Sequence, residues 1–231
     1  MTCMTPPRQR SVRRADALST DRIVEAAIEI LDAEGERGLT FRALAARLST
    51  GAGAIYHHVA SKEELLTEAT TGVIERVLAD VPDSATPEEG ARAITLIALG
   101  MFDAIDEHPW VGAHLPVVPW QPGMVRLFES IGGRLDSLGV PESAQFNAAS
   151  ALLNYILGVA AQNAANARTR VAGAGREEFM AETADRWEQL SPASYPFLHR
   201  VARQLRHHDD REQFLAGVDL VLAGLAAGQD G

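Results

Sequence analysis

Apolar residues recur along this chain at intervals of three and four positions, which is the period of an amphipathic α-helix. The first such segment covers about residues 20–33, and its apolar face consists of Ile23, Ala26, Ala27, Ile30 and Leu31. Ser19 stands directly before it in the position of an N-cap, and Gly35 and Gly38 follow its end. We therefore predict one capped helix that ends at the two glycines.

Two short helices and a longer one are predicted after these glycines. The first closes near Leu48, the tripeptide Ser49-Thr50-Gly51 interrupts the pattern, and the second covers 52–59. Residues 61–64, Ser-Lys-Glu-Glu, have the capping-box pattern and begin a helix over 62–79 that Pro82 stops. Two short helices joined by a tight glycine-containing turn are typical of a helix-turn-helix, whose second helix enters the major groove of DNA.

The remainder of the chain keeps the helical period and contains no convincing strand pattern. Prolines stand at several of the expected helix boundaries. Helices are predicted over 87–107, 110–116, 121–138, 142–170, 176–190, 194–207 and 210–227. The predicted fold class is all-α, with an N-terminal three-helix helix-turn-helix domain (19–66) and a larger C-terminal helical domain (67–231).

The first 18 residues are rich in proline and arginine, so we predict a flexible basic arm over 1–18. The arm either follows the DNA or is a solvated tail, and the sequence leaves both open. This start lacks the apolar stretch of a signal peptide, and no run of about 18 apolar residues suggests a membrane span. The single cysteine, Cys3, excludes an internal disulfide. A cytoplasmic protein is expected.

The distribution of charge supports a DNA-binding end. The formal net charge of −10 by itself argues against a nucleic-acid partner. Residues 1–62, however, carry 9 basic and 7 acidic side chains, whereas the remainder carries 12 and 24. A slightly basic head on an acidic body directs one end of the molecule towards phosphate. Lys62, the only lysine in the chain, stands just after the helix-turn-helix.

The head resembles the TetR family of bacterial repressors. The resemblance covers about residues 19–66 and rests on Gly38-Leu39-Thr40, Arg42-Ala43-Leu44-Ala45, Ile55-Tyr56-His57-His58-Val59 and Ser61-Lys62. The body resembles the effector-binding part of the tetracycline-repressor branch more loosely, through His108-Pro109-Trp110, Leu157-Gly158 and the segment from Phe214 to Leu225. This resemblance implies a homodimer that binds an operator in double-stranded DNA and responds to a small molecule.

Arg42 and Tyr56 are the first candidates for contacts with DNA. Arg42 projects from the second helix and can bond a guanine edge bidentately or hold a phosphate, and the resemblance favours the base. Tyr56 carries a hydroxyl on a stiff ring, which suits a phosphate oxygen at the groove wall. The alternatives are an exposed surface arginine and a half-buried core tyrosine.

Further phosphate contacts are expected around these two residues. His57 and His58 can donate to a phosphate or a base, and the resemblance favours phosphate for His58. Lys62, at a helix N-terminus, offers its charge and free amides to a phosphate. Thr40 and Ser19 are expected to be helix caps first and phosphate contacts second.

The exposed turn of the recognition helix is short of polar side chains. It contains Ala52, Gly53 and Ala54, whose methyl groups can touch a thymine methyl but cannot make bidentate contacts. We therefore expect few direct base contacts, with specificity depending on Arg42 and on DNA shape.

Aromatic and amide side chains in the body suggest a ligand pocket. Aromatic walls with a few amides and one histidine suit a mostly apolar small molecule with some polar groups. The alternative is plain core packing, although Asn154 lies on an apolar helix, where a polar side chain needs a partner. The candidate lining residues are Trp110, His114, Trp120, Met124, Phe128, Asn154, Tyr155, Gln162 and Asn166.

No metal or other cofactor is expected. Tetracycline-type repressors hold a magnesium–drug chelate through a His, a Thr and a Glu, and by resemblance these positions fall on His114, Val117 and Gln162. Neither valine nor glutamine supplies the hydroxyl or anionic oxygen that magnesium would need there. We therefore expect a metal-free ligand other than tetracycline. The neighbouring His57 and His58 would diverge on a helix, which argues against a metal site between them.

Two helices, 142–170 and 210–227, are apolar and rich in small residues, which permits close helix packing. By the resemblance they pair with their symmetry mates as a four-helix dimer interface, and an internal bundle core is the alternative. A dimer would place two heads on a palindrome with half-site centres about 34–36 Å apart.

Two other functions compete with that of a ligand-responsive repressor. One is an all-α enzyme, but the sequence has no nucleophile elbow, phosphate-binding glycine loop, zinc-ligand spacing or converging carboxylate pair. Its nearest approach to a metal cluster, His207-His208-Asp209-Asp210, is expected to cap the last helix instead. The other is a regulator that binds a protein partner in place of a small ligand, which the sequence leaves open.

Overall fold

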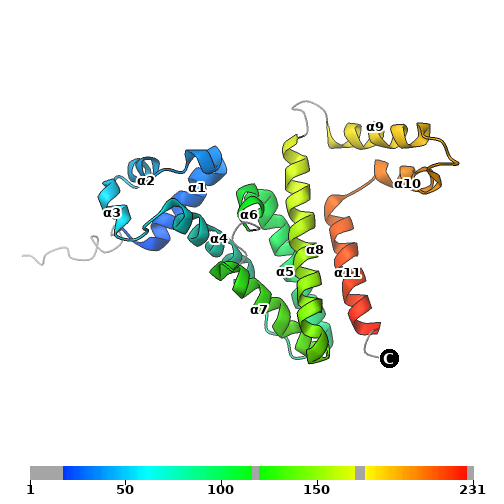
Figure 1. Cartoon of the computed structure of the whole chain (residues 1–231), viewed down its shortest axis with the longest axis horizontal. Coiled ribbons are helices and arrows are strands. Elements are labelled where there is room, and N and C mark those ends of the chain that lie inside the picture. The colour runs from blue at the N-terminus through cyan, green and yellow to red at the C-terminus, as the bar shows by residue number, and fades with distance from the viewer. Residues whose placement is uncertain (1–17, 116–119, 170–174, 228–231) are drawn as a thin grey trace, which may run out of the picture. The chain divides into compact units, whose positions relative to one another are not determined.

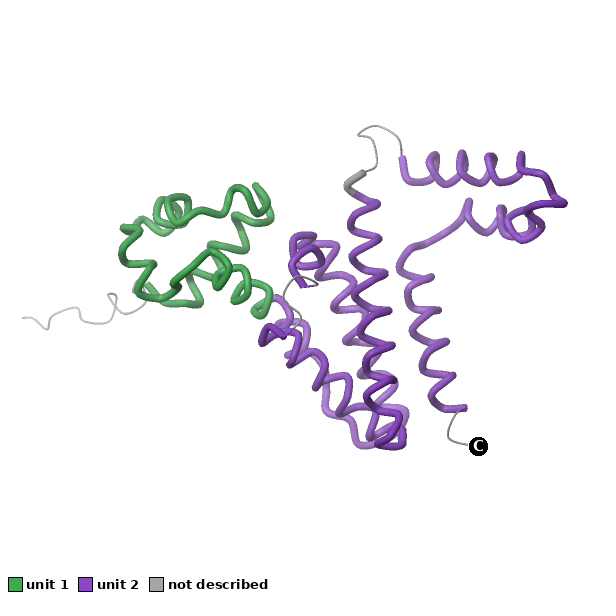
Figure 2. Tube along the Cα trace, in the orientation of Figure 1, with its two compact units in different colours: residues 1–72 green, residues 73–231 purple. Residues whose placement is uncertain are grey.

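The computed structural model describes residues 18–115, 120–169 and 175–227. These residues form eleven helices and no strand, so the all-α prediction is confirmed. The chain divides into two compact units, residues 1–72 and 73–231 (Figure 2). Helix α4 (Lys62–Ala79) runs across this division, and the predicted basic arm lies outside the described residues except for Leu18.

The first unit is a three-helix head followed by the first part of α4 (Figure 1). Its helices are α1 (Thr20–Gly38), α2 (Phe41–Arg47) and α3 (Ala52–Tyr56). Helix α2 packs against both α1 and α3. The apolar stripe predicted for α1 is buried against apolar side chains of the following elements, and these buried residues are Ile23, Ala27, Ile30, Leu31, Leu39, Leu44, Ile55, Val59 and Leu65.

Helix α1 is interrupted at Gly35 and does not end there. Gly35 has φ 68° and ψ −173°, and a short helical segment continues beyond it to Gly38. This combination of angles is accessible almost only to glycine, because any Cβ would clash with the local backbone. The expectation of a helix that ends near residue 33 is therefore corrected to a kinked helix.

Gly35→Ala is expected to destabilise the chain by about 1–3 kcal/mol through backbone strain alone. Apart from the local helix backbone, a Cβ at Gly35 would meet no atom within 4 Å, so packing against other residues adds nothing to this cost. Gly51→Ala is the matched control, because Gly51 has φ −88° and equally open surroundings. Urea unfolding of the full chain measures both free energies, and equal losses would contradict a conformational role for Gly35.

The turn between α2 and α3 covers the predicted residues 49–51, but its left-handed residue is not the glycine. Ser49 has φ 52°, in the left-handed region, whereas Gly51 is extended and stands at the N-cap of α3. The amide of Thr50 donates to Ala45 O at 2.9 Å and closes the turn. Helix α3 ends at Tyr56, so the prediction that it continues to Val59 is wrong, and His57 and His58 lie in the turn that follows.

The second unit is a helical bundle built around one long helix, α8 (Figure 1). Helices α5, α6, α7 and α11 all pack on α8, whereas α9 and α10 pack chiefly on each other beside its end. The bounds of these helices are α5 (Pro87–Glu107), α6 (Pro109–His114), α7 (Pro122–Ser137), α8 (Glu142–Thr169), α9 (Arg176–Gln189), α10 (Pro196–Arg206) and α11 (Asp210–Ala227). They differ from the predicted ranges by at most two residues at each end.

Local caps fix several of these helix starts. Thr86 and Glu89 form a complete capping box at α5, where Glu89 accepts from the amides of Ala85 and Thr86 at 2.9 and 3.1 Å. These bonds hold the pKa of Glu89 below its usual value, and the bond from the Ala85 amide has the largest effect. Asp209 accepts from the amides of Arg211 and Glu212, so the prediction that it caps the last helix is confirmed.

The core of the second unit is continuous across four helices. Phe214 of α11 lies between the rings of Phe102 on α5 and Tyr155 on α8, at centroid distances of 4.7 and 5.7 Å. Within the described residues, no helix is long and apolar enough to span a membrane. Other fully buried apolar residues of this unit are Ile94, Ile97, Met101, Ile105, Leu127, Ile131, Leu152 and Ile156.

Candidate DNA-binding surface and ligand cavities

Arg42 is an uncommitted positive charge on the surface of the head. It is the second residue of α2 and is exposed, and it forms no hydrogen bond or ion pair with the residues that the structure describes. Arg47, at the other end of α2, differs because its Nε donates to Glu29 Oε2 at 2.5 Å. The guanidinium of Arg42 therefore keeps all its N–H donors for an external acceptor.

Tyr56 is held in place by an aromatic partner. Its ring stacks on Phe41 of α2 with 4.1 Å between centroids and 12° between planes, while 55% of the residue stays exposed. The neighbouring Ile55 is fully buried and fixes α3 in the core. The alternative of a half-buried core tyrosine does not describe this residue, which is exposed, but the stacking on Phe41 limits the positions that the hydroxyl can take.

The two neighbouring histidines, His57 and His58, are more accessible to DNA than the lysine that begins α4. Both histidines are exposed in the turn after α3. Lys62 is less available than expected, because its Nζ donates to Glu36 O at 2.6 Å and lies 3.8 Å from Glu36 Oε1. Lys62 therefore links the start of α4 to the end of α1, and a phosphate contact would have to share or replace these bonds.

Ser19 and Thr40 act as helix caps, as expected. Ser19 Oγ accepts from Arg22 N at 3.3 Å and Thr40 Oγ1 accepts from Ala43 N at 3.1 Å. At the recognition helix, Gly53 is exposed, and Ala52 and Ala54 are partly exposed. The surface of α3 ahead of Tyr56 therefore offers methyl groups and backbone but no side-chain hydrogen-bonding group.

A cavity of about 330 Å³ lies in the second unit among α5, α6, α7 and α8. Two of the nine predicted ligand-binding residues, Met124 and Asn154, line it. Asn154 is exposed, so burial does not by itself require a partner for its amide. The other lining residues are apolar and were missed, because in the sequence they are indistinguishable from core: Ile105, Gly112, Leu115, Leu153, Leu157, Gly158 and Ala161.

Three more predicted residues line a different cavity. Tyr155, Gln162 and Asn166 border a space of about 790 Å³ among α8, α9 and α11. Phe179 and Trp187 of α9 contribute its aromatic part, and neither was predicted. The expectation of one shared lining for the nine residues is corrected, since side chains one position apart on α8, such as Asn154 and Tyr155, face different cavities.

The remaining predicted residues line neither of these two cavities. Trp110 is buried at the start of α6, His114 is half-buried at its end, and Phe128 meets the ring of Phe146 edge-on at 6.1 Å. Trp120 is 84% exposed, which contradicts its place in a pocket wall. Trp120 follows the segment 116–119, which includes Val117 and lies outside the described residues.

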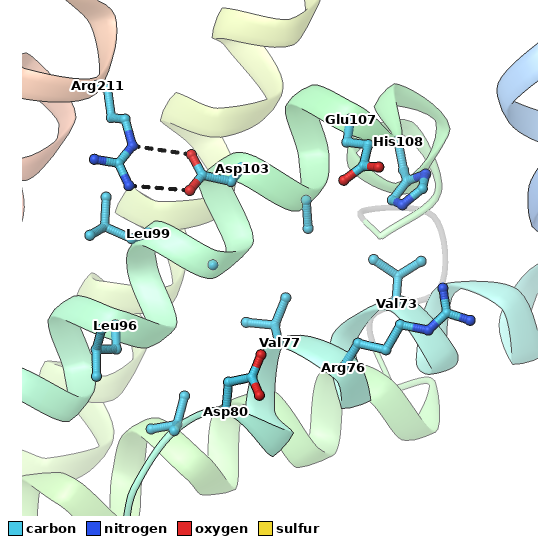
Figure 3. A pocket seen from close by; sticks show the side chains of 13 residues that line it. Val73, Arg76, Val77, Asp80, Leu96, Leu99, Asp103, Glu107, His108 and Arg211 are labelled. Atoms are coloured by element: carbon cyan, nitrogen blue, oxygen red, sulfur yellow. Dashed lines mark hydrogen bonds and ion pairs between the residues drawn. The ribbon is translucent and has the colours of Figure 1, made fainter.

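A third cavity of about 510 Å³ lies among α4, α5 and the start of α11 (Figure 3). Its walls combine valines and leucines with charged side chains, and none of the nine predicted residues lines it. Arg211 donates from Nε and Nη2 to the two carboxylate oxygens of Asp103, each at 3.2 Å, which raises the pKa of the guanidinium. This pair links α11 to α5. In the described residues, no group of three or more His, Cys, Asp or Glu side chains could hold a metal ion.

Both units match known sequence families. Residues 23–69 match the family described as "Bacterial regulatory proteins, tetR family". Residues 101–228 match the family described as "Tetracyclin repressor-like, C-terminal domain". An HTH-type transcriptional regulator of Saccharopolyspora erythraea is 30% identical over a stretch that covers 65% of this chain and 63% of that protein. The HTH-type transcriptional repressor DrrR1 of Streptomyces coeruleorubidus is 28% identical over 90% of this chain and 77% of the repressor.

Solved structures agree with these matches over nearly the whole chain. The transcriptional regulator SCO7222, a TetR from Streptomyces coelicolor, is 49% identical, covers 91% of this chain and 99% of its own, and superposes with a TM-score of 0.82. The TetR family protein ActR of the same organism, in complex with actinorhodin, is 27% identical over 92% of this chain and 98% of its own, with a TM-score of 0.74. This chain therefore belongs to the TetR family and is a DNA-binding transcriptional regulator.

Proposed function

We propose that this chain is a repressor that binds a palindromic operator and leaves it when a small, mostly apolar molecule enters its body. The observation that carries the proposal is the exposed, uncommitted Arg42 beside the stacked Tyr56 on a helix-turn-helix. Arg42 would bond a guanine edge, and Tyr56 would bond a backbone phosphate. The similarity to the repressor DrrR1 supports the direction of regulation.

The remaining predicted DNA contacts complete this surface. His57 and His58 lie exposed next to Tyr56 and would donate to phosphate oxygens. Because α3 presents only Ala52, Gly53 and Ala54 to a groove, sequence discrimination would rest on Arg42 and on the shape of the operator. Ser19 and Thr40 would contribute through the helix starts that they cap, and Lys62 after exchange of its bond to Glu36.

The effector would bind in the cavity of about 330 Å³ lined by Met124 and Asn154. Its walls are aliphatic apart from the Asn154 amide, which suits an apolar molecule with few polar groups. That ActR is seen with actinorhodin and with (S)-DNPA supports an organic ligand. If the effector lowers the affinity for the operator about 100-fold, the coupling free energy between effector binding and DNA binding is about 2.7 kcal/mol.

The repressor would act as a homodimer through α8 and α11. Both helices leave faces of small residues exposed, among them Ala151, Gly158, Ala165, Ala216 and Gly224. Leu220 of α11 is 74% exposed, which is unfavourable for a large aliphatic side chain unless a second copy covers it. A dimer would also supply the second head that a palindromic operator requires.

The enzyme alternative rests on no feature of the described cavities beyond the pair of His208 with Asp210, whose Nε2 and Oδ1 atoms lie 2.9 Å apart at the start of α11. The relatives reported above are transcriptional regulators, so we propose a regulator without enzymatic activity that acts in the bacterial cytoplasm. A protein partner in place of the small ligand would require a large apolar surface, and the position of the Met124 cavity among four helices favours the small ligand.

A Met124→Trp variant is expected to bind operator DNA normally and to lose its response to the effector. The indole would fill a cavity whose lining lies entirely in the second unit, whereas Val125→Trp places the same group at a 53% exposed neighbour outside the lining. Mobility shifts with the DNA upstream of the chain's own gene measure the response, with actinorhodin and (S)-DNPA as the first probes. Equal release of Met124→Trp and Val125→Trp proteins would place the effector in another cavity, and absence of specific DNA binding would refute the repressor itself.

A further inference from the structure

A polar cavity in the head lies outside all the predicted contacts. Its volume is about 490 Å³, and its described walls come from the start of α1, the end of α2 and the turn between α2 and α3. The wall residues are Leu18, Arg22, Arg47, Leu48, Ser49 and Thr50. Two arginines and two residues with hydroxyl groups therefore line this space, and no acidic residue belongs to its described lining. Such a set of donors matches an anion with several oxygen acceptors.

Arg47 retains donors for such an anion. The bond described for it runs from Nε to Glu29 Oε2, so its two terminal nitrogens carry N–H groups that no residue in the described chain accepts. Both partners of this ion pair are about half exposed, with 47% and 56% of their side chains accessible. An exposed pair of this kind contributes little to stability, and its arginine can exchange one carboxylate for another anion.

The turn leaves side-chain hydroxyls rather than amides for an anion. The amides of Ser49 and Thr50 donate to the carbonyls of Ala46 and Ala45 at 3.3 and 2.9 Å. Ser49 nevertheless adopts a left-handed φ of 52°, a conformation that a residue with a side chain rarely takes. Backbone strain of this kind gathers at functional sites, and here it lies on the wall of the cavity with the two arginines.

We propose that this cavity holds a phosphate group of the DNA backbone between Arg22 and Arg47. The inference rests on the proposed function as a DNA-binding repressor and adds a contact outside the Arg42 and Tyr56 pair. Helix α3 begins at Ala52, two residues after Thr50, so the bound phosphate belongs to the strand that borders the groove entered by α3. Because α3 has few side chains for bases, backbone contacts of this kind supply much of the affinity. Glu29 is the counter-ion that Arg47 exchanges for the phosphate.

The test compares Arg47→Gln with Glu29→Gln across a series of KCl concentrations. For Arg47→Gln the affinities for the operator and for random DNA should fall by similar factors. The slope of log K against log salt should become shallower by about 1 for each head that contacts DNA. For Glu29→Gln the expected change is the opposite, tighter binding to both DNAs, because the guanidinium no longer has a competing carboxylate. A purely structural ion pair would instead make both variants weaker binders.

Arg126→Gln is the matched control, because Arg126 also forms an exposed ion pair, with Glu75 at 2.7 Å, but lies in the second unit. Its salt slope should equal that of the unchanged protein. The inference is overturned if Arg47→Gln keeps the original slope or if Glu29→Gln weakens binding. Random DNA keeps this test independent of operator recognition: loss of discrimination with an intact Arg47 effect refutes only the repressor, and absence of all DNA binding refutes both.

Inorganic phosphate distinguishes a DNA phosphate from a free anion. At constant ionic strength, millimolar phosphate should raise the melting temperature of the unchanged protein only slightly and should compete weakly with DNA. A strong thermal shift that disappears in Arg47→Gln, combined with an unchanged salt slope for DNA, would assign the cavity to free phosphate and overturn the proposal for the DNA backbone.

Discussion

An Arg42→Ala, Tyr56→Ala double variant is expected to bind the operator about 1000-fold more weakly than the unchanged protein. Each bidentate contact between arginine and guanine contributes about 1–3 kcal/mol of discrimination, and a dimer makes this contact twice. Loss of roughly 4 kcal/mol corresponds to the stated factor, because every 1.4 kcal/mol is tenfold in the dissociation constant. The uncommitted state of Arg42 strengthens the expectation, since no bond to another described residue must break before DNA binds.

Single variants separate the two roles. Arg42→Ala should reduce the ratio between operator and random DNA, whereas Tyr56→Phe keeps the stack on Phe41 and should weaken binding to both DNAs equally. Fluorescence anisotropy at a fixed salt concentration measures all four affinities. If the ratio survives in Arg42→Ala, the specificity lies in DNA shape alone, and the assignment of Arg42 to a base edge is refuted. The stability of each variant should stay unchanged, because both side chains are exposed.

The sequence predicted best those features that depend on a few neighbouring residues. Ser19, Thr40 and Asp209 cap helices in the structure because each side-chain oxygen needs only the amides two or three positions ahead. The helix ranges of the body were predictable for the same reason, since the apolar period and the flanking prolines are local signals. The exposed position of Arg42 followed from the polar face of a short helix.

Features that depend on tertiary packing were predicted less well. The sequence placed the turn correctly at Ser49-Thr50-Gly51, but it did not indicate that Ser49, and not the glycine, is the left-handed residue. Lys62 could not be assigned to Glu36 from spacing alone, since the two lie 26 positions apart. The polar cavity beside Arg47 was missed because it joins three segments, and no single segment carries an anion-binding motif.

The division of the body residues between cavities was also beyond the sequence. Aromatic residues drew attention to Trp120, which is exposed, whereas the cavity next to Met124 is lined by Leu and Ala side chains of ordinary core type. Whether such residues border a space or pack against one another depends on the separation of their helices. Gly112 and Ile105 both line this cavity, yet α6 and α5 approach so closely at this point that a Cβ on Gly112 would lie 2.9 Å from Ile105 Cγ2.

Phe214→Ala is expected to destabilise the body by about 3–5 kcal/mol, the usual cost of removing a fully buried phenylalanine ring. Phe214 has no exposed surface, and its ring lies between Phe102 of α5 and Tyr155 of α8. The Tyr155 hydroxyl also donates to Phe214 O at 3.1 Å, and burial raises the pKa of this tyrosine. Loss of the ring would leave a cavity where three helices meet. Tyr155 already lies so close to Gly217 that a Cβ there would clash with it.

Phe146→Ala is the matched control, because it removes the same ring from a position that is 69% exposed on α8. Its cost should stay below about 1 kcal/mol, as for most surface substitutions. Urea unfolding at one fixed protein concentration measures both variants, since dimerisation would make the apparent stability depend on concentration. Tyr155→Phe should fall between them, at about 0.5–1.5 kcal/mol for one hydrogen bond with the stack retained. A loss for Phe214→Ala no greater than that for Tyr155→Phe would mean that the hydroxyl, not the three-ring stack, joins α11 to the bundle.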